Sequence, residues 1–363
     1  MANFTAKDVN ELRKSTGVGM MDCKKALTEA DGDVEKAIEL LREKGLATQA
    51  KKAGRVAAEG MVVAKVNADN SVGCVVEVNS ETDFVANTDE FKAFVNQVAD
   101  TIIEKNPADV EALKATTVSG GTMTVDEALQ ELFLKIRENL QIRRFVRMEG
   151  ILVPYIHGGG KIGVMVRAES PAGATPEVLA AAKDCALQVA AMNPQYISRN
   201  DISAEELAKI KEITIDSALN DATTLPKPIL NKLLDKAIGE KVWSDEDINN
   251  FEEHKSNMNY VWNFLSDAAK VQLGELAMAD KASITAEKMF GGLVEGRVSK
   301  QLKEICLLDQ TYVKAEDGKQ SVAKYLESVS KDLKITKMIR FEVGEGMDCL
   351  LYTSPSPRDL STS

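Results

Sequence analysis

The chain carries EGMVV at residues 59–63 and GCVVEV at 73–78, and the same pair returns as EGILV at 149–153 and GVMV at 163–166. Both members of the pair are displaced by 90 residues. Short apolar segments bounded by glycine and polar turn residues predict β-strands, so each copy predicts a β-hairpin. A helix is expected after each hairpin, because QVA at 97–99 recurs at 188–190. The repeat therefore predicts an α+β fold with two related units, each burying one face of an antiparallel sheet under helices.

The two units are expected to meet near residue 143. The first is expected to span residues 56–143, and the second 144–198 together with 306–348. The late segment MIRFEV at 338–343 is expected to complete the second sheet after a long excursion.

Residues 1–55 predict three short helices ahead of the repeat. Thr5 and Asp8 form a capping-box pattern for the first helix, and Gly17 is placed to end it. A third helix is expected after Asp33, with Gly45 as its end. A three-helix bundle of this size is marginal on its own and usually serves as a binding module.

Residues 199–305 predict a helical excursion. Two long helices that leave and return to nearly the same place predict a projecting antiparallel hairpin, with residues 221–283 between them. This stretch also contains an aromatic group made of Trp243, Tyr260, Trp262 and Phe264. Such a group is more often a small core than a second binding surface.

Residues 349–363 do not fit these patterns. The stretch CLLYTSPSPRD at 349–359 looks like a translated adapter from a sequencing library. We therefore expect a non-native tail and leave it out of the fold.

Composition excludes several classes of protein. The 363 residues carry a net charge of −11, which disfavours nonspecific binding to nucleic acid. Five widely spaced cysteines without a CxxC predict neither a disulfide framework nor a zinc site. The polar N-terminus lacks the apolar core of a secretory signal, and no apolar run is long enough to span a membrane. A cytoplasmic protein is expected.

Signatures of enzymes are weak. HGGG at 157–160 matches the oxyanion loop of some esterases, but no GxSxG supplies a nucleophile, and Ser170 has no base partner that the sequence identifies. The phosphate-loop pattern fails because Ile162 follows Gly160-Lys161. Only two histidines are present, which makes a His-rich metal site a poor hypothesis. The glycines are more simply the turn of the second hairpin.

Four residues remain open to two interpretations each. Met20 and Met21 are adjacent, so both cannot face one bundle core. Either one lies in the core and the other is partly exposed, or the pair forms an adaptable apolar contact for a partner. Phe84, in a polar loop, either folds back onto the core, which the residues alone favour, or projects as an anchor. His157 is either a solvated turn residue or a polar contact.

Four ordered segments closely resemble bacterial elongation factor Ts. They are ELRKSTGVGMMDCKKAL at 11–27, TDFV at 82–85, VEGR at 294–297 and RFEVGEG at 340–346. The resemblance covers about residues 1–220 and 284–348. The resemblance therefore leads us to expect that residues 221–283 exceed the family's usual hairpin and that the family's C-terminal segment is missing.

The resemblance implies a guanine-nucleotide exchange factor for elongation factor Tu, without bond chemistry and without a cofactor. It implies a bundle like a ubiquitin-associated domain, two related core subdomains and a coiled-coil excursion that is linked in some members to homodimers. In the family, the loop equivalent to Thr82-Asp83-Phe84-Val85 pushes its Phe between helices of the partner's GTPase domain. Phe84 is then the wedge, and Asp83 helps to unsettle the partner's magnesium and phosphate site.

The resemblance also extends the expected contact surface. The family's N-terminal bundle touches the same GTPase domain, which makes Arg13, Met20 and Met21 candidate contacts. His157 matches a histidine of the second subdomain that is implicated near the partner.

Overall fold

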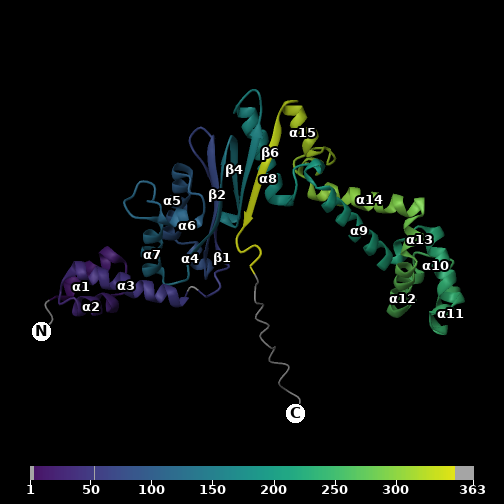
Figure 1. Cartoon of the computed structure of the whole chain (residues 1–363), viewed down its shortest axis with the longest axis horizontal. Coiled ribbons are helices and arrows are strands. Elements are labelled where there is room, and N and C mark those ends of the chain that lie inside the picture. The colour runs from purple at the N-terminus through teal and green to yellow at the C-terminus, as the bar shows by residue number, and fades with distance from the viewer. Residues whose placement is uncertain (1–3, 53, 348–363) are drawn as a thin grey trace, which may run out of the picture. The chain divides into compact units, whose positions relative to one another are not determined.

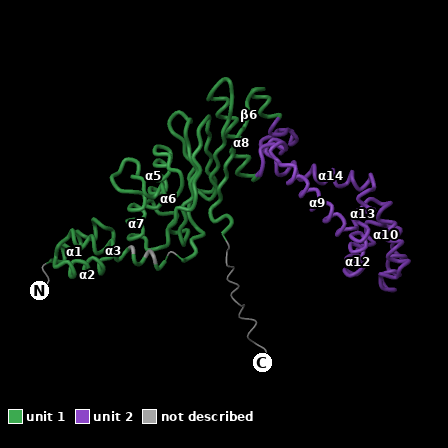
Figure 2. Tube along the Cα trace, in the orientation of Figure 1, with its two compact units in different colours: residues 1–193, 324–363 green, residues 194–323 purple. Residues whose placement is uncertain are grey.

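The computed structural model describes residues 4–52 and 54–347, which form two compact units (Figure 2). The described residues up to 193 and from 324 onward form the first unit, and residues 194–323 form the second. The tail expected at 349–363 lies outside the described residues. No helix in the described part of the chain is long and apolar enough to cross a membrane.

The first unit begins with the expected three-helix bundle. Its helices are α1 (Ala6–Thr16), α2 (Met20–Glu29) and α3 (Val34–Lys52). The Thr5 hydroxyl accepts a hydrogen bond from the Asp8 N–H, while the Asp8 carboxylate accepts one from the Thr5 N–H at 2.6 Å. This capping box was predicted, and Gly17 ends α1 in the left-handed conformation, also as predicted.

The prediction that Gly45 ends the third helix is wrong, because α3 continues to Lys52. Gly45 lies instead where α3 packs against α7 (Val125–Ile136). A Cβ atom at Gly45 would lie 2.2 Å from Cδ2 of Leu134. The glycine therefore permits the close approach of two helices and does not stop one.

The first sheet has three antiparallel strands, in the order β1 (Glu59–Val66), β2 (Val72–Ser80) and β3 (Gln141–Glu149). Between β2 and β3 the chain forms α4 (Asp83–Ala86), α5 (Asp89–Lys105), α6 (Val110–Ala115) and α7. Helix α5 lies against one face of this sheet (Figure 1). Its apolar side chains, including Phe91 and Val95, share a buried core with Val76 and Val78 of β2.

Strand β3 was not predicted, and the expected boundary at residue 143 falls inside it. Its sequence, QIRRFVRME, interrupts the apolar pattern with Arg143, Arg144 and Arg147. The segment expected to be one strand at 149–153 is divided at Gly150, which has φ +129°. Sheet one ends at Glu149 and sheet two begins at Ile151.

The second sheet has the order β4 (Ile151–His157), β5 (Ile162–Glu169) and β6 (Lys334–Glu342), all antiparallel. The late strand therefore completes this sheet, as predicted. Helix α8 (Pro176–Met192) packs on β4 and β5, and α15 (Val322–Val329) precedes β6.

The other face of the first sheet packs against the second sheet. Val62, Val75, Leu152, Met165 and Phe341 are among the buried residues of this shared core. A Cβ atom on Gly163 of β5 would lie 2.3 Å from Cγ1 of Val62, so the sheets approach closely there. The hairpin repeat thus builds two sheets that bury each other, which the sequence did not predict.

A buried carboxylate joins the two sheets. Glu77 of β2 is 0% exposed and accepts hydrogen bonds from Arg143 Nη1 (3.0 Å), Arg144 Nε (2.6 Å), Asn79 Nδ2 (3.1 Å) and the Gly344 N–H (2.9 Å). Burial raises the pKa of Glu77, but these hydrogen bonds outweigh it and lower the pKa below its ordinary value. Because Gly344 follows β6, the carboxylate holds the end of the second sheet against the first.

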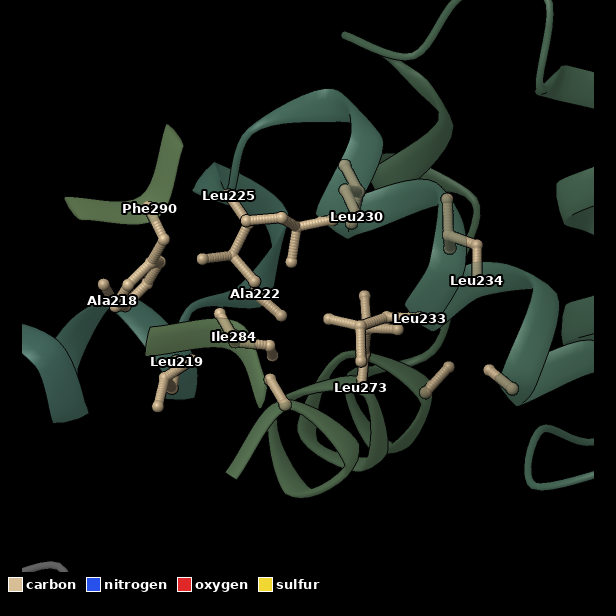
Figure 3. Close-up of a cluster of buried hydrophobic side chains, with 14 of the residues drawn as sticks. Ala218, Leu219, Ala222, Leu225, Leu230, Leu233, Leu234, Leu273, Ile284 and Phe290 are labelled. Atoms are coloured by element: carbon tan, nitrogen blue, oxygen red, sulfur yellow. The ribbon is translucent and has the colours of Figure 1, made fainter. Parts of the chain in front are cut away.

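The second unit is helical. It contains α9 (Ala204–Asn220), α10 (Lys227–Gly239), α11 (Asp245–His254), α12 (Asp267–Ala279), α13 (Lys281–Thr285) and α14 (Lys288–Ile305). Helices α9 and α14 pack against each other, and the shorter helices between them share their core (Figure 3). Trp243 lies in this core and donates its indole N–H to the Ala269 carbonyl at 2.9 Å. Tyr260 and Phe264 are exposed, so the core interpretation holds for only part of the aromatic group.

Replacing Glu77 by Gln is expected to lower the free energy of unfolding by about 3 kcal/mol, because it leaves two arginines without their shared anion. The folded pKa of Glu77 is depressed, so its contribution is present above the unfolded pKa and is lost as pH falls through the folded value. The variant should therefore lose less stability on acidification than the native chain does. Urea unfolding followed by circular dichroism at several pH values measures both effects.

The matched control is Glu345→Gln. The Glu345 side chain is 44% exposed and pairs with the same Arg144 at 3.1 Å. An exposed pair of this kind contributes at most about 1 kcal/mol. Equal losses in the two variants would contradict the role of the buried carboxylate.

Candidate functional site

The Thr82-Asp83-Phe84-Val85 segment forms a short, capped turn directly after β2. Thr82 is the N-cap of α4, and its hydroxyl accepts a hydrogen bond from the Val85 N–H at 3.4 Å. Val85 is half-buried and the next residue, Ala86, is buried in the core under the first sheet. The turn is therefore attached to the core on its Val85 side.

Phe84 points away from that core. Its side chain is 82% exposed, whereas Phe91, one helix later, is 0% exposed. The interpretation of Phe84 as a core residue is wrong. Asp83 beside it is also exposed. A large aromatic ring with almost no contact to its own chain is a candidate anchor for a partner.

The turn is held by the segment that follows α7. Glu138 accepts hydrogen bonds from the Thr82 N–H at 3.0 Å and from the Thr82 hydroxyl at 2.9 Å. The residues next to this pair are also bonded. The carboxylate of Glu81, which precedes Thr82, accepts a hydrogen bond at 2.6 Å from the N–H of Asn139, which follows Glu138. No sequence pattern marks Glu138 or Asn139, because both act across more than fifty residues of chain.

The candidate residues of the bundle also face outward. Met20 is 49% exposed, Met21 is 66% exposed, and both lie in the first turn of α2. The interpretation with one core methionine is therefore wrong. Arg13, in the last turn of α1, is exposed as well.

The bundle is connected to the core through the same segment after α7. Arg137 forms an ion pair with Asp22 of α2, and its carbonyl accepts a hydrogen bond from Lys52 at the end of α3. Residues 137–139 thus contact both the bundle that carries the methionines and the turn that carries Phe84.

His157 lies at the end of β4, and Gly158–Gly160 form the turn that leads into β5, as predicted. The imidazole is exposed, and its Nδ1 lies 3.1 Å from the Tyr155 hydroxyl. Ser170 follows the opposite end of β5. Eight residues at about 3.3 Å each separate the two ends by about 26 Å, which is too far for a serine and its base. The geometry does not support the hydrolase alternative.

The described cysteines are buried. Burial raises the pKa of Cys74 and of Cys185 to about 12, so both thiols stay protonated near neutral pH. Among residues 4–52 and 54–347, no group of three or more His, Cys, Asp or Glu side chains is arranged to hold a metal ion.

Comparison with known proteins gives consistent matches. A family model described as elongation factor TS matches residues 81–345. Elongation factor Ts of Clostridioides difficile (strain 630) is 43% identical over 351 residues, which cover 96% of this chain and 95% of that protein. Elongation factor Ts of Clostridium perfringens (strain 13) is 43% identical over 353 residues, and that of Trichlorobacter lovleyi is 38% identical over 356. Each of these two alignments covers 95% of this chain and 94% of the relative.

Replacing Phe84 by Ala is expected to change the free energy of unfolding by less than about 0.5 kcal/mol, because the ring is almost fully exposed. Phe91→Ala, the matched control, should cost about 3–5 kcal/mol, because that ring is fully buried. Urea unfolding of the two variants compares them directly. A loss from Phe84→Ala as large as that from Phe91→Ala would show that Phe84 belongs to the core.

Proposed function

The chain belongs to the elongation factor Ts family, and from that premise we propose that it is a guanine-nucleotide exchange factor for elongation factor Tu. It binds elongation factor Tu carrying GDP and promotes release of the GDP during translation elongation. The cytoplasm is the proposed site of action, because translation elongation takes place there. The reaction makes and breaks no covalent bond.

The observation that supports this proposal best is the exposed Phe84 on a capped turn. An apolar ring that is 82% exposed on the surface of a chain with net charge −11 gains free energy only when a partner covers it. Aromatic anchors of this kind dominate the energy of protein interfaces. Phe84 is therefore the proposed wedge between helices of the partner's GTPase domain.

Exchange follows from thermodynamic linkage. If the chain binds nucleotide-free elongation factor Tu more tightly than the GDP complex, it must weaken GDP binding by the same factor. A wedge produces this effect by stabilising a GTPase conformation in which the contacts to phosphate and magnesium are incomplete. The Asp83 carboxylate, exposed beside the ring, is proposed to help by disturbing the partner's magnesium site.

Other exposed residues are proposed as secondary contacts. Met20 and Met21 offer flexible apolar side chains, and Arg13 offers a charge on the same bundle. His157, at the tip of the second hairpin, is a proposed polar contact. Neither nucleic acid nor a membrane is part of this proposal.

We also propose that the helical unit associates with a second copy of the chain. Its surface exposes Ile213 on α9, Val271 on α12 and Met289 on α14, each by more than half. Sedimentation velocity at rising concentration should reveal a dimer that the double substitution Ile213→Glu and Val271→Glu weakens. A monomer at every concentration would contradict this association.

The exchange function is tested by following release of fluorescent GDP from bacterial elongation factor Tu. The native chain should accelerate release, and Phe84→Ala should reduce that acceleration by about 10-fold or more, because it removes the proposed anchor. Met192→Ala is the matched control. Met192 is 49% exposed at the end of α8, outside the proposed contact residues, and its loss should leave the rate unchanged.

Failure of the native chain to accelerate GDP release would overturn the exchange function. Fast release by both the native chain and Phe84→Ala would keep the function but reject Phe84 as the wedge. In that case the bundle residues would be the next candidates.

A further inference from the structure

We propose that Glu138 is a positioning residue for nucleotide exchange, because its carboxylate holds the backbone and the side chain of Thr82 and thereby fixes the direction in which Phe84 projects. The proposal rests on the exchange function proposed above. It adds a residue that does not itself lie in the Thr82-Asp83-Phe84-Val85 motif.

Both oxygens of Glu138 are engaged by one residue. Oε2 accepts the Thr82 N–H at 3.0 Å, and Oε1 accepts the Thr82 hydroxyl at 2.9 Å. A hydroxyl has one proton to donate and lone pairs with which to accept. Donation to Glu138 directs the lone pairs of the Thr82 oxygen toward the Val85 N–H at 3.4 Å. The carboxylate therefore orients the group that caps α4.

A second hydrogen bond runs in the opposite direction. The Glu81 carboxylate accepts the Asn139 N–H at 2.6 Å and pairs with Arg55 at 3.3 Å. The Asn139 side chain in turn donates to the Arg55 carbonyl at 2.8 Å. Each segment therefore supplies one carboxylate that accepts hydrogen bonds from the other: Glu138 accepts from Thr82, and Glu81 accepts from Asn139. These bonds fix how the turn and the segment after α7 are aligned.

The turn needs these hydrogen bonds because α4 is too short to be stable as a helix on its own. It has four residues, and a helix of one turn is unstable without outside contacts. A mobile turn would lose conformational freedom when Phe84 enters a partner, and that loss would weaken binding. Hydrogen bonds to an ionised carboxylate are stronger than those between neutral groups. Glu138 therefore prepares the turn before the partner arrives.

Glu138→Gln tests the proposal with little change in shape. The amide oxygen of Gln can still accept from the Thr82 N–H, but without the charge of the carboxylate. The amide NH2 then faces the Thr82 hydroxyl, which would have to accept there and so would lose its orientation toward the Val85 N–H. We expect the acceleration of GDP release to fall by about 10-fold. Glu131→Gln is the matched control, because Glu131 lies on α7 and pairs with Arg42 at 3.2 Å, away from the turn. It should keep the native rate.

A double-mutant cycle separates positioning from a general structural effect. If Glu138 acts through Phe84, adding Glu138→Gln to Phe84→Ala should slow exchange by less than about 2-fold. Full activity of the single Glu138→Gln variant, or equal slowing in both backgrounds, would overturn the proposal. Because the native chain and Phe84→Ala are measured alongside, failure of the exchange function itself is recognised separately.

Thr82 supplies a second route if Glu138→Gln fails to fold. Thr82→Ser keeps the hydroxyl that binds Glu138, whereas Thr82→Val keeps the shape and removes it. Thr82→Ser should retain near-native exchange, and Thr82→Val should be slowed. Equal rates for the two variants would contradict the proposal.

Discussion

The buried Glu77 carboxylate is the interaction on which the two-sheet core depends. It collects hydrogen bonds from β2, from β3 and from the turn after β6, so three segments far apart in sequence meet at one anion. Arg144, one of its partners, also lies 4.1 Å from the centre of the Phe341 ring. Gly344 is required at this point, because it has φ +74° and a Cβ atom there would lie 2.5 Å from the Ala58 carbonyl oxygen.

The turn that carries the proposed anchor Phe84 begins a few residues farther along the same strand. β2 is buried along most of its length, ends at Ser80, and passes directly into the Thr82 cap. A rigid strand and the carboxylate of Glu138 thus hold a turn whose tip is almost fully exposed. This arrangement suits a wedge, because the turn loses its conformational entropy during folding and not on binding. The apolar surface of Phe84 is still free to be buried when a partner binds.

The sequence predicted those parts of the structure that short-range chemistry determines. The hairpin repeat gave the strands around 59–78 and 151–166, and the Thr5 capping box gave the start of α1. Strand β3 was missed because its arginines, two of which bind Glu77, interrupt the alternation of apolar residues. Gly45 was misinterpreted because the need for a small residue comes from Leu134, 89 residues farther along the chain.

The candidate site likewise contains some residues that the sequence predicted and others that only the structure shows. The family motif predicted that Phe84 projects from the surface, which its exposure confirms, although the residues alone favoured a place in the core. Glu138 could not be found from sequence, because its role follows from a contact with Thr82 across 56 residues. The two exposed methionines are a similar case, since only the packing of α2 shows that neither enters the bundle core.

The proposed function requires this chain to favour the nucleotide-free state of elongation factor Tu. The most direct test is calorimetric titration of the chain into elongation factor Tu, once without nucleotide and once with saturating GDP. Binding should be tighter without nucleotide, by the same factor by which the chain weakens GDP binding. Equal affinity for the two states would contradict it.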